Sequence, residues 1–193
     1  HLSIRWDLPI TSADYEWAQN HLPMKDPILV VNPAASKPER SWPVDRYIDV
    51  LQQAIDKWQV QIVLTGGPGD YDRTLAEQIL KVIPATNLVG KTRPKQLLAV
   101  ISNAKAVLCP DTGPSHMSTA VNTPVVALHA VTNPLISGPY RFQHLVVNRY
   151  PDAVSQVLGT SPEQNVWGTQ VHGDEAMKLI TVDDVMEQLA KVF

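Results

Sequence analysis

The chain has 193 residues, of which 44% are hydrophobic and 18% charged, and its formal net charge is −3. This composition predicts a folded globular protein that is long enough to bury a core. No Lys/Arg cluster favours nucleic-acid binding, and no apolar run is long enough to span a membrane. The single cysteine excludes an internal disulfide and is typical of a reducing compartment, so we expect a cytoplasmic protein.

The first 26 residues contain Trp6 and Trp17 but show no clear periodic pattern. We interpret residues 1–26 as an interdomain linker and a leading helix. The chain starts with His1 rather than Met and shows no signal peptide, which suggests a piece cut from a longer protein. We expect Trp6 or Trp17 to contribute to an apolar surface on which another domain docks.

From residue 27 onward, short β-branched runs alternate with helical patterns. Strands are predicted at residues 28–31, 60–64, 86–89, 106–109, 124–128 and 144–147. Helical spacing of apolar residues predicts helices that begin at Pro43, about residue 75, about residue 97, Pro114 and Thr181, the last ending near Val192. The alternation predicts an α/β fold, a Rossmann-like parallel sheet of about six strands with helices on both faces. We place this domain at residues 27–148 and assign residues 149–193 to an irregular excursion and a C-terminal helix of the same domain.

The segment 110–116 follows the fourth predicted strand, at the sheet edge where parallel sheets bind ligands. Gly113 permits close approach of the backbone to a ligand, and Pro114 suits a first helical position. The helix start then offers backbone N–H groups at Ser115 and His116, next to the positive end of the helix dipole. This arrangement predicts an anion site that suits a diphosphate.

Side chains of the same segment extend that prediction. Thr112 and Ser115 add hydroxyl donors, and His116 donates to a phosphate oxygen of the leaving nucleotide. Asp111 does not suit a phosphate, and we expect its carboxylate to hold the loop by accepting backbone N–H bonds. The alternative interpretation is an ordinary capped helix whose histidine packs against its neighbours.

The loop after the first strand, residues 32–43, combines small residues with positive charge. Lys37 and Arg40 lie on the same predicted rim as the anion site. A cation about 4 Å from a phosphate contributes about 4 kcal/mol at an effective dielectric constant of 20. The alternative interpretation is a solvated loop with two ordinary surface cations.

A glycine-rich turn, residues 65–70, follows the second strand and ends in Asp70. It matches neither the dinucleotide fingerprint nor the phosphate-binding loop. Asp70 either binds ribose hydroxyls or simply caps the start of a helix. His129, at the end of the fifth strand, either lines the pocket or packs in the core, and we interpret Cys109 as structural. No histidine or cysteine spacing predicts a metal site.

Together these motifs resemble the ADP-heptose:lipopolysaccharide heptosyltransferase family. The resemblance runs from about residue 28 to residue 148 and rests on five segments: 32–36 with Trp42-Pro43, 65–70, 88–92, 111–116 and 120–128. It implies one half of a GT-B fold, in which the carboxy-terminal Rossmann-like domain holds the sugar nucleotide.

The resemblance also implies roles for single residues. Thr112, Gly113 and His116 contact the diphosphate of the donor. Ser36 and Arg40 match family positions near the donor phosphate and sugar, although the family usually has Lys where Arg40 stands. Asp70 falls near the acid that binds the ribose.

The function implied is inverting transfer of heptose, or a related sugar, from an ADP-sugar to the lipopolysaccharide core. The resemblance assigns the catalytic base to an amino-terminal domain, so no catalytic residue, cofactor or metal is expected in this chain. It also implies a cytoplasmic location, free or peripheral at the inner membrane. Two alternatives stay open, another GT-B nucleotide-sugar enzyme such as a UDP-sugar transferase or epimerase, and a non-catalytic nucleotide-binding module.

Overall fold

The computed structural model describes residues 6–23 and 27–193 and shows one sheet of six parallel strands. The strands lie in the order β3-β2-β1-β4-β5-β6, so the order reverses between β1 and β4. Their bounds are β1 Ile28–Val31, β2 Gln61–Leu64, β3 Ala85–Asn87, β4 Ala106–Pro110, β5 Val125–His129 and β6 Val147–Asn148. The α/β Rossmann-like prediction is therefore confirmed.

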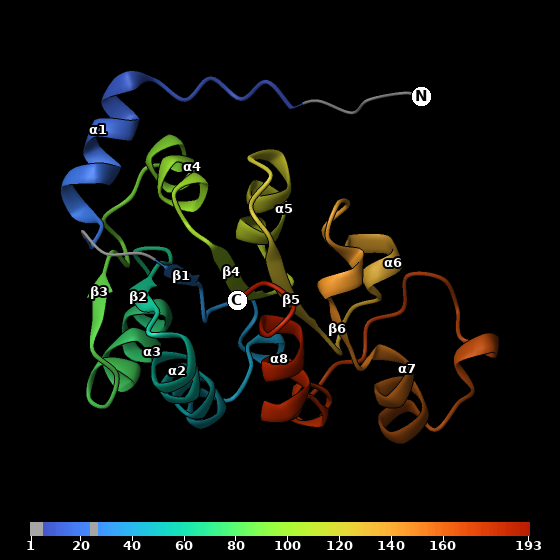
Figure 1. The fold of residues 1–193 in the computed structure, drawn as a ribbon. Coiled ribbons are helices and arrows are strands. Elements are labelled where there is room, and N and C mark those ends of the chain that lie inside the picture. The colour runs from blue at the N-terminus through green and yellow to red at the C-terminus, as the bar shows by residue number, and fades with distance from the viewer. Residues whose placement is uncertain (1–5, 24–26) are drawn as a thin grey trace.

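Helices cover both faces of the sheet (Figure 1). One face carries α2, α3 and α8, and the opposite face carries α1, α4 and α5. Two short helices, α6 and α7, lie beyond the β6 edge of the sheet. Their bounds are α1 Ser12–His21, α2 Val44–Trp58, α3 Asp70–Leu80, α4 Pro94–Ser102, α5 Gly113–Ala120, α6 Pro134–Ser137, α7 Tyr150–Ala153 and α8 Val182–Leu189.

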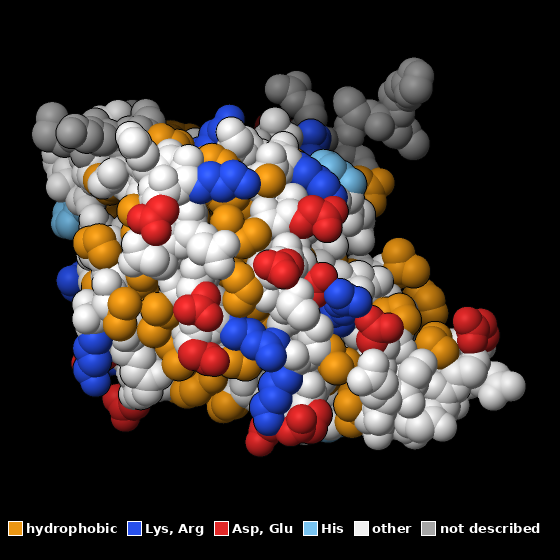
Figure 2. Space-filling view, turned by 60° about the horizontal axis from the view of Figure 1, so that its bottom comes forward, with side chains coloured by type: hydrophobic (Ala, Val, Ile, Leu, Met, Phe, Trp, Pro, Cys, Tyr) orange, Lys and Arg blue, Asp and Glu red, His pale blue; other side chains and the backbone are white. Residues whose placement is uncertain are grey.

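Strand β1 shows how the apolar runs build this core. Leu29 and Val31 belong to the cluster under α2, α3 and α8, whereas Ile28 and Val30 belong to the cluster under α1 and α4. Successive side chains of a strand point to opposite faces, so a strand covered on both sides must be apolar throughout. On the outer surface seen in Figure 2, Lys and Arg side chains are interspersed with Asp and Glu.

Two predicted strands are shifted in the structure. Strand β3 ends at Asn87, two residues early, because the Asn87 side chain accepts the N–H of Val89 at 3.0 Å and turns the chain. Strand β6 contains Val147 and Asn148 rather than residues 144–147. His144 lies instead in a 3-10 turn, Gln143–Leu145, in which the Val146 N–H donates to the Gln143 carbonyl.

The segment after β6 contains two short helical pieces. It begins with α7 and continues as a wide helical turn over Val154–Leu158 before Gly159 reverses the chain at φ 67°. The C-terminal helix has the predicted Thr181 cap, with a capping box between Thr181 and Asp184. It ends at Leu189 rather than near Val192.

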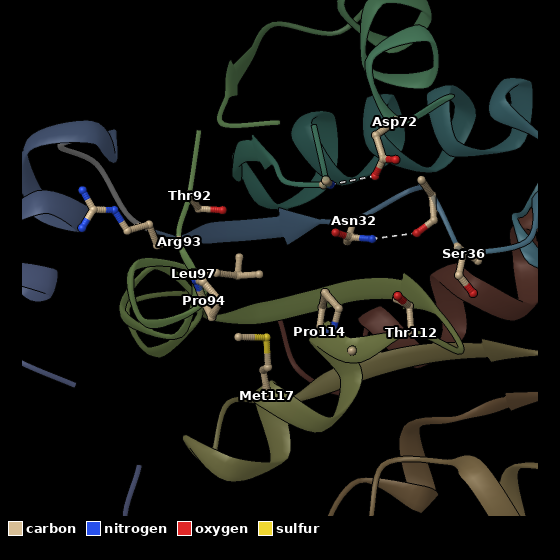
Figure 3. A pocket seen from close by; sticks show the side chains of 15 residues that line it. Asn32, Ser36, Asp72, Thr92, Arg93, Pro94, Leu97, Thr112, Pro114 and Met117 are labelled. Carbon is tan, nitrogen blue, oxygen red and sulfur yellow. Dashed lines mark hydrogen bonds between the residues drawn. The ribbon is translucent and has the colours of Figure 1, made fainter. Parts of the chain in front are cut away.

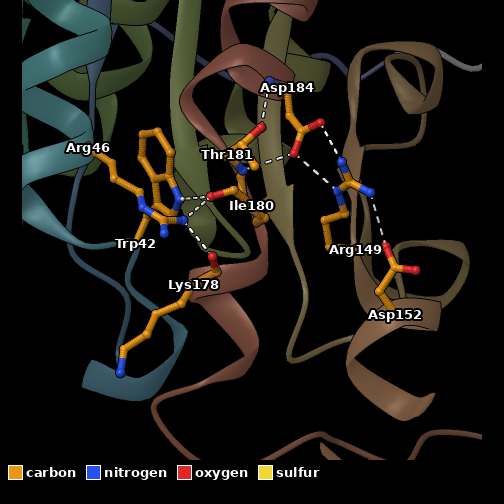
Figure 4. A network of polar contacts seen from close by, with 8 residues as sticks. All are labelled: Trp42, Arg46, Arg149, Asp152, Lys178, Ile180, Thr181 and Asp184. Atoms are coloured by element: carbon orange, nitrogen blue, oxygen red, sulfur yellow. Dashed lines mark hydrogen bonds and ion pairs between the residues drawn. The ribbon is translucent and has the colours of Figure 1, made fainter. Parts of the chain in front are cut away.

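A polar network fastens this C-terminal part to the sheet (Figure 4). The indole N–H of Trp42 donates to the Ile180 carbonyl at 3.1 Å, and the Arg46 guanidinium donates to the same carbonyl and to that of Lys178. Arg149 forms a forked ion pair with Asp184, at 2.6 and 3.1 Å. These contacts hold α8 against α2.

The leading helix α1 packs against α4 and is fastened at its start by a capping box between Thr11 and Asp14. Trp6 contacts Tyr140 edge-to-face at 6.1 Å and is 37% exposed. Trp17 stacks on His21 at 4.0 Å between centroids. Residues 1–5 and 24–26 of the predicted linker lie outside the described residues, and whether another domain docks on these tryptophans stays a prediction.

Candidate functional site

A cavity of about 430 Å³ opens at the carboxyl ends of the strands, where the strand order reverses between β1 and β4. Loops that follow β1, β2 and β4, together with the start of α4, form its walls. In doubly wound sheets the reversal separates the two flanking loops and leaves a crevice, because the chain leaves neighbouring strands in opposite directions. The cavity therefore lies where a sheet of this order binds its ligand.

One end of the cavity is polar (Figure 3). Ser36 and Thr112 line it with hydroxyl groups that have no hydrogen-bond partner among the described residues. Asn32 is buried and stabilises the loop after β1, because its side-chain N–H donates to the Ala34 carbonyl at 2.8 Å. A hydroxyl that lines a cavity without a partner in the protein is available to a ligand.

The other end is apolar and is formed mainly by Pro94, Leu97 and Met117. Figure 3 shows the Leu97 and Met117 side chains directed into the same space, one from α4 and one from α5. Arg93 lines the rim, with its guanidinium turned away from the cavity centre in Figure 3. An apolar slot joined to a polar end suits an amphipathic ligand that has a flat ring at one end and charge at the other.

The start of α5 forms the floor between the two ends. Gly113 is exposed, and nothing lies within 4 Å of the place where a side-chain Cβ would be. Ser115 departs from the prediction: it is fully buried, and its backbone N–H and hydroxyl both donate to the Thr112 carbonyl, at 3.0 and 2.8 Å. Ser115 therefore closes the first turn of the helix and offers neither group to a ligand, whereas Gly113 leaves the backbone open.

Arg40 and Asp111 form an ion pair at 2.6 Å instead of facing a ligand as separate groups. The prediction that Asp111 accepts backbone N–H bonds is wrong, since its carboxylate accepts from the side chains of Arg40, Thr132 and Ser137. Burial alone would raise the pKa of Asp111, but the hydrogen bonds from Thr132 and Arg40 and the guanidinium charge hold it below its ordinary value. Asp111 is therefore ionised at neutral pH.

The remaining predicted site residues lie around the cavity in different ways. His116 is exposed in the first turn of α5, one residue from the Met117 that lines the cavity. Lys37 is exposed and lines neither this cavity nor the smaller one beside Asp111. Asp70 is exposed at the start of α3.

Asp72, which the sequence did not single out, takes the place expected for Asp70. It lines the cavity, and its carboxylate accepts the N–H of Gly67 at 2.8 Å. A Cβ at Gly66 would lie 2.8 Å from this carboxylate, so a larger residue there would displace the Asp72 side chain. A shift of two residues along a helix start is beyond what sequence pattern resolves, because both acids lie in the first turn.

Cys109 and His129 are both fully buried at strand ends. Burial raises the pKa of the Cys109 thiol well above its usual value, so the thiol stays protonated and packs as a small apolar group.

Among residues 6–23 and 27–193, no three His, Cys, Asp or Glu side chains gather in a group that could hold a metal ion. No helix in the same residues is long and apolar enough to cross a bilayer.

Residues 2–167 match the family described as glycosyltransferase family 9 (heptosyltransferase). The chain belongs to this family. It is 32% identical over 190 residues to the lipopolysaccharide core heptosyltransferase OpsX of Haemophilus influenzae, a match that covers 97% of this chain and 54% of the relative. It is 33% identical over 122 residues to lipopolysaccharide heptosyltransferase 3 of Escherichia coli, covering 62% of this chain and 35% of the relative.

Solved structures of the family share the fold. ADP-heptose lps heptosyltransferase II of E. coli superimposes with a TM-score of 0.69 at 22% identity, over 96% of this chain and 52% of that chain. The E. coli heptosyltransferase WaaC with ADP gives 0.67 at 17% identity, over 93% and 48%. This chain thus spans about half the length of the heptosyltransferases that it matches. Its six-stranded sheet corresponds to one half of their GT-B fold.

Proposed function

We propose that this chain binds the sugar-nucleotide donor, ADP-heptose, for a heptosyltransferase that builds the lipopolysaccharide core. The observation that carries the proposal is the cavity at the β1/β4 crevice, which joins an apolar slot to a hydroxyl-lined end at the start of α5. Adenine fits the slot between Leu97 and Met117, and the ribose then lies near Asp72. The diphosphate reaches Ser36, Thr112 and the open backbone of Gly113.

Three features support a diphosphate at the polar end. The start of α5 carries the positive end of a helix dipole, which favours an anion by about 0.3–2 kcal/mol. Gly113 lets phosphate oxygens approach the backbone, because no atom lies within 4 Å of its missing side chain. His116 is exposed in the same turn and supplies a donor, while Lys37, in the loop after β1, adds positive charge near the cavity without lining it.

The sugar then extends past Gly113 toward the Arg40–Asp111 pair, where a second cavity of about 120 Å³ is lined by both residues. Because Asp111 neutralises Arg40 there, the place suits the hydroxyl groups of a neutral sugar better than another phosphate.

We propose that the acceptor and the catalytic base belong to the other half of a complete heptosyltransferase. Inverting displacement needs both halves, since orientation of the two reactants alone contributes about 7–11 kcal/mol. A cytoplasmic location, free or at the inner membrane, belongs to the same proposal.

The decisive experiment is calorimetric titration of the chain with ADP, UDP and GDP, alongside a Gly113→Ala variant. We expect ADP to bind most tightly, and Gly113→Ala to lose at least tenfold in ADP affinity because the new methyl group occupies the path of the phosphate. The variant should keep the stability of the wild type, since Gly113 does not have positive φ and its surroundings are open. Preference for UDP would indicate another nucleotide-sugar enzyme, and equal binding by the variant would remove the start of α5 from the site.

Catalysis has its own test. The chain incubated with ADP-heptose and a heptose-deficient lipopolysaccharide acceptor should transfer no sugar, while a complete heptosyltransferase assayed beside it transfers readily. Transfer by the chain at a comparable rate would place the base within these residues. Tight ADP binding by a complete protein that never transfers sugar would favour a non-catalytic nucleotide-binding module.

A further inference from the structure

The second cavity lies over the ends of β4 and β5, and Asp111 forms part of its wall. One carboxylate oxygen of Asp111, Oδ2, accepts three hydrogen bonds: from Arg40 Nη2 at 2.6 Å, Thr132 Oγ1 at 2.7 Å and Ser137 Oγ at 3.0 Å. The other oxygen, Oδ1, has no partner among the described residues. The carboxylate is thus held by one oxygen and leaves the other available.

Behind Thr132 lies His129, whose side chain is fully buried and whose Nδ1 is 3.2 Å from Thr132 Oγ1. A threonine hydroxyl has one hydrogen, and here that hydrogen is donated to Asp111. Thr132 Oγ1 must therefore accept from His129, which assigns the proton of the imidazole to Nδ1. The other ring nitrogen, Nε2, is then an unprotonated acceptor, buried and without a partner among the described residues.

The charge state of His129 is consistent with this assignment. Burial lowers the pKa of His129 to about 4, against the attraction of Asp111, so the ring is neutral at pH 7. The charged and titratable groups that act on it are Asp111 at the end of β4, Arg40 from the loop after β1, and His116 on α5. A neutral Nδ1–H donor orients the Thr132 hydroxyl in one direction only, toward Asp111.

We propose that His129 and Thr132 are positioning residues for Asp111, holding its carboxylate by Oδ2 so that Oδ1 stays available to accept a hydroxyl hydrogen of the donor sugar at the second cavity. This inference rests on the proposed function and deepens it. The ligand class that the arrangement selects is a neutral polyhydroxylated sugar. A sugar that carries its own carboxylate would be repelled, because Arg40 is already paired with Asp111.

The test compares affinities for ADP and for ADP-D-β-D-heptose, measured by calorimetry on the same variants. Thr132→Val should lose at least tenfold in affinity for ADP-D-β-D-heptose and stay within twofold for ADP. Thr132→Ser keeps the hydroxyl and should therefore retain the wild-type ratio of the affinity for ADP-D-β-D-heptose to the affinity for ADP. His129→Leu should behave like Thr132→Val, while His129→Asn, whose amide N–H replaces the Nδ1 donor, should retain most of the affinity.

The matched control is Thr123→Val, which removes another buried hydroxyl that donates to the Ile101 carbonyl at 2.9 Å. Thr123 precedes the start of β5, whereas the cavity lies over the end of that strand. This variant should change neither affinity, even though it destabilises the fold. Equal losses for ADP and ADP-D-β-D-heptose in Thr132→Val, or no loss in either, would overturn the inference. A wild-type chain that fails to bind ADP would instead overturn the proposed function.

A measurement without ligand tests the positioning of Asp111 independently of the proposed function. Carboxyl ¹³C NMR titration should show the pKa of Asp111 higher in Thr132→Val than in the wild type, because a donor to its ionised form is gone. Imidazole ¹⁵N shifts should place the proton of His129 on Nδ1. An unchanged Asp111 titration, or a proton on Nε2, would show that His129 and Thr132 do not hold the carboxylate, whatever the binding data give.

Discussion

Two regions of this molecule differ in whether their polar side chains have hydrogen-bond partners within the protein. In the network around Trp42, Arg46 and Arg149, the indole N–H and both guanidinium groups have partners within the chain (Figure 4). At the cavity in Figure 3, the hydroxyls of Ser36 and Thr112 have none among the described residues. Both regions border the same six-stranded sheet.

The difference separates residues that stabilise the fold from residues that await a ligand. A buried donor without a partner costs about 1–3 kcal/mol, so a fold retains partners where water is excluded. Around the cavity, solvent satisfies the open groups until a ligand displaces it. Substitutions in the network should therefore lower the free energy of unfolding, and substitutions at the cavity should lower affinity.

The largest expected effect is on the network side. Trp42 is 1% exposed and contacts Tyr47 edge-to-face at 5.1 Å, so Trp42→Ala should lower the free energy of unfolding by about 3–5 kcal/mol. Urea denaturation measures this, with Trp167→Ala as the control, since Trp167 is 77% exposed and its loss should cost less than about 0.5 kcal/mol. The ADP affinity of the folded Trp42→Ala protein should change little. A large loss of affinity would show that the network also supports the cavity.

The second expected effect is a pH dependence of stability that comes from the buried ring of His129. Its pKa is about 4 in the fold against an ordinary value of 6.5, so the unfolded chain takes up the proton first as pH falls. The contribution of the neutral His129 ring to the free energy of unfolding is fully present above pH 6.5. It is lost as pH falls from 6.5 to 4, by up to about 3 kcal/mol. Denaturation at a series of pH values measures the slope, and His129→Asn should flatten it. A wild-type curve that is flat over this window would contradict a buried neutral ring.

On the cavity side, His116→Ala should weaken ADP binding by about 1–3 kcal/mol, the effect of a lost hydrogen bond to a charged group. Unfolding should change by less than about 0.5 kcal/mol, because the side chain is exposed. Calorimetry gives the first quantity and urea denaturation the second. His144→Ala, another exposed histidine, is the matched control, and equal affinities for the two variants would remove His116 from the site.

The smallest expected effect concerns divalent ions. The phosphate-facing groups proposed for the cavity are hydroxyls, backbone N–H groups and a histidine, and these neutralise or bind phosphate directly. ADP affinity should therefore change less than twofold between EDTA and millimolar magnesium. A strong magnesium requirement in the titration would mean that the carboxylates near the cavity, Asp72 above all, hold a metal with the nucleotide.

Much of this fold could be predicted from local pattern. The runs at residues 28–31 and 106–109 are apolar throughout, and the structure buries both faces of the two strands they form. Gly113-Pro114 after a buried strand indicated the start of α5, and Thr181 indicated the cap of α8. These features are decided within a few residues, by side-chain periodicity, proline geometry and capping.

The polar partners that lie far apart in the sequence were decided by tertiary structure alone. Arg40 and Asp111 are 71 residues apart, and the sequence interpretation treated them as separate groups until the sheet placed them at 2.6 Å. His129 and Thr132 came to the same carboxylate because β4 and β5 are neighbours and end at the same edge. Local sequence determines which strands and turns form. Strand order determines which charged side chains form pairs, because it decides which loops lie at the same edge of the sheet. The pattern within a single segment does not contain the strand order.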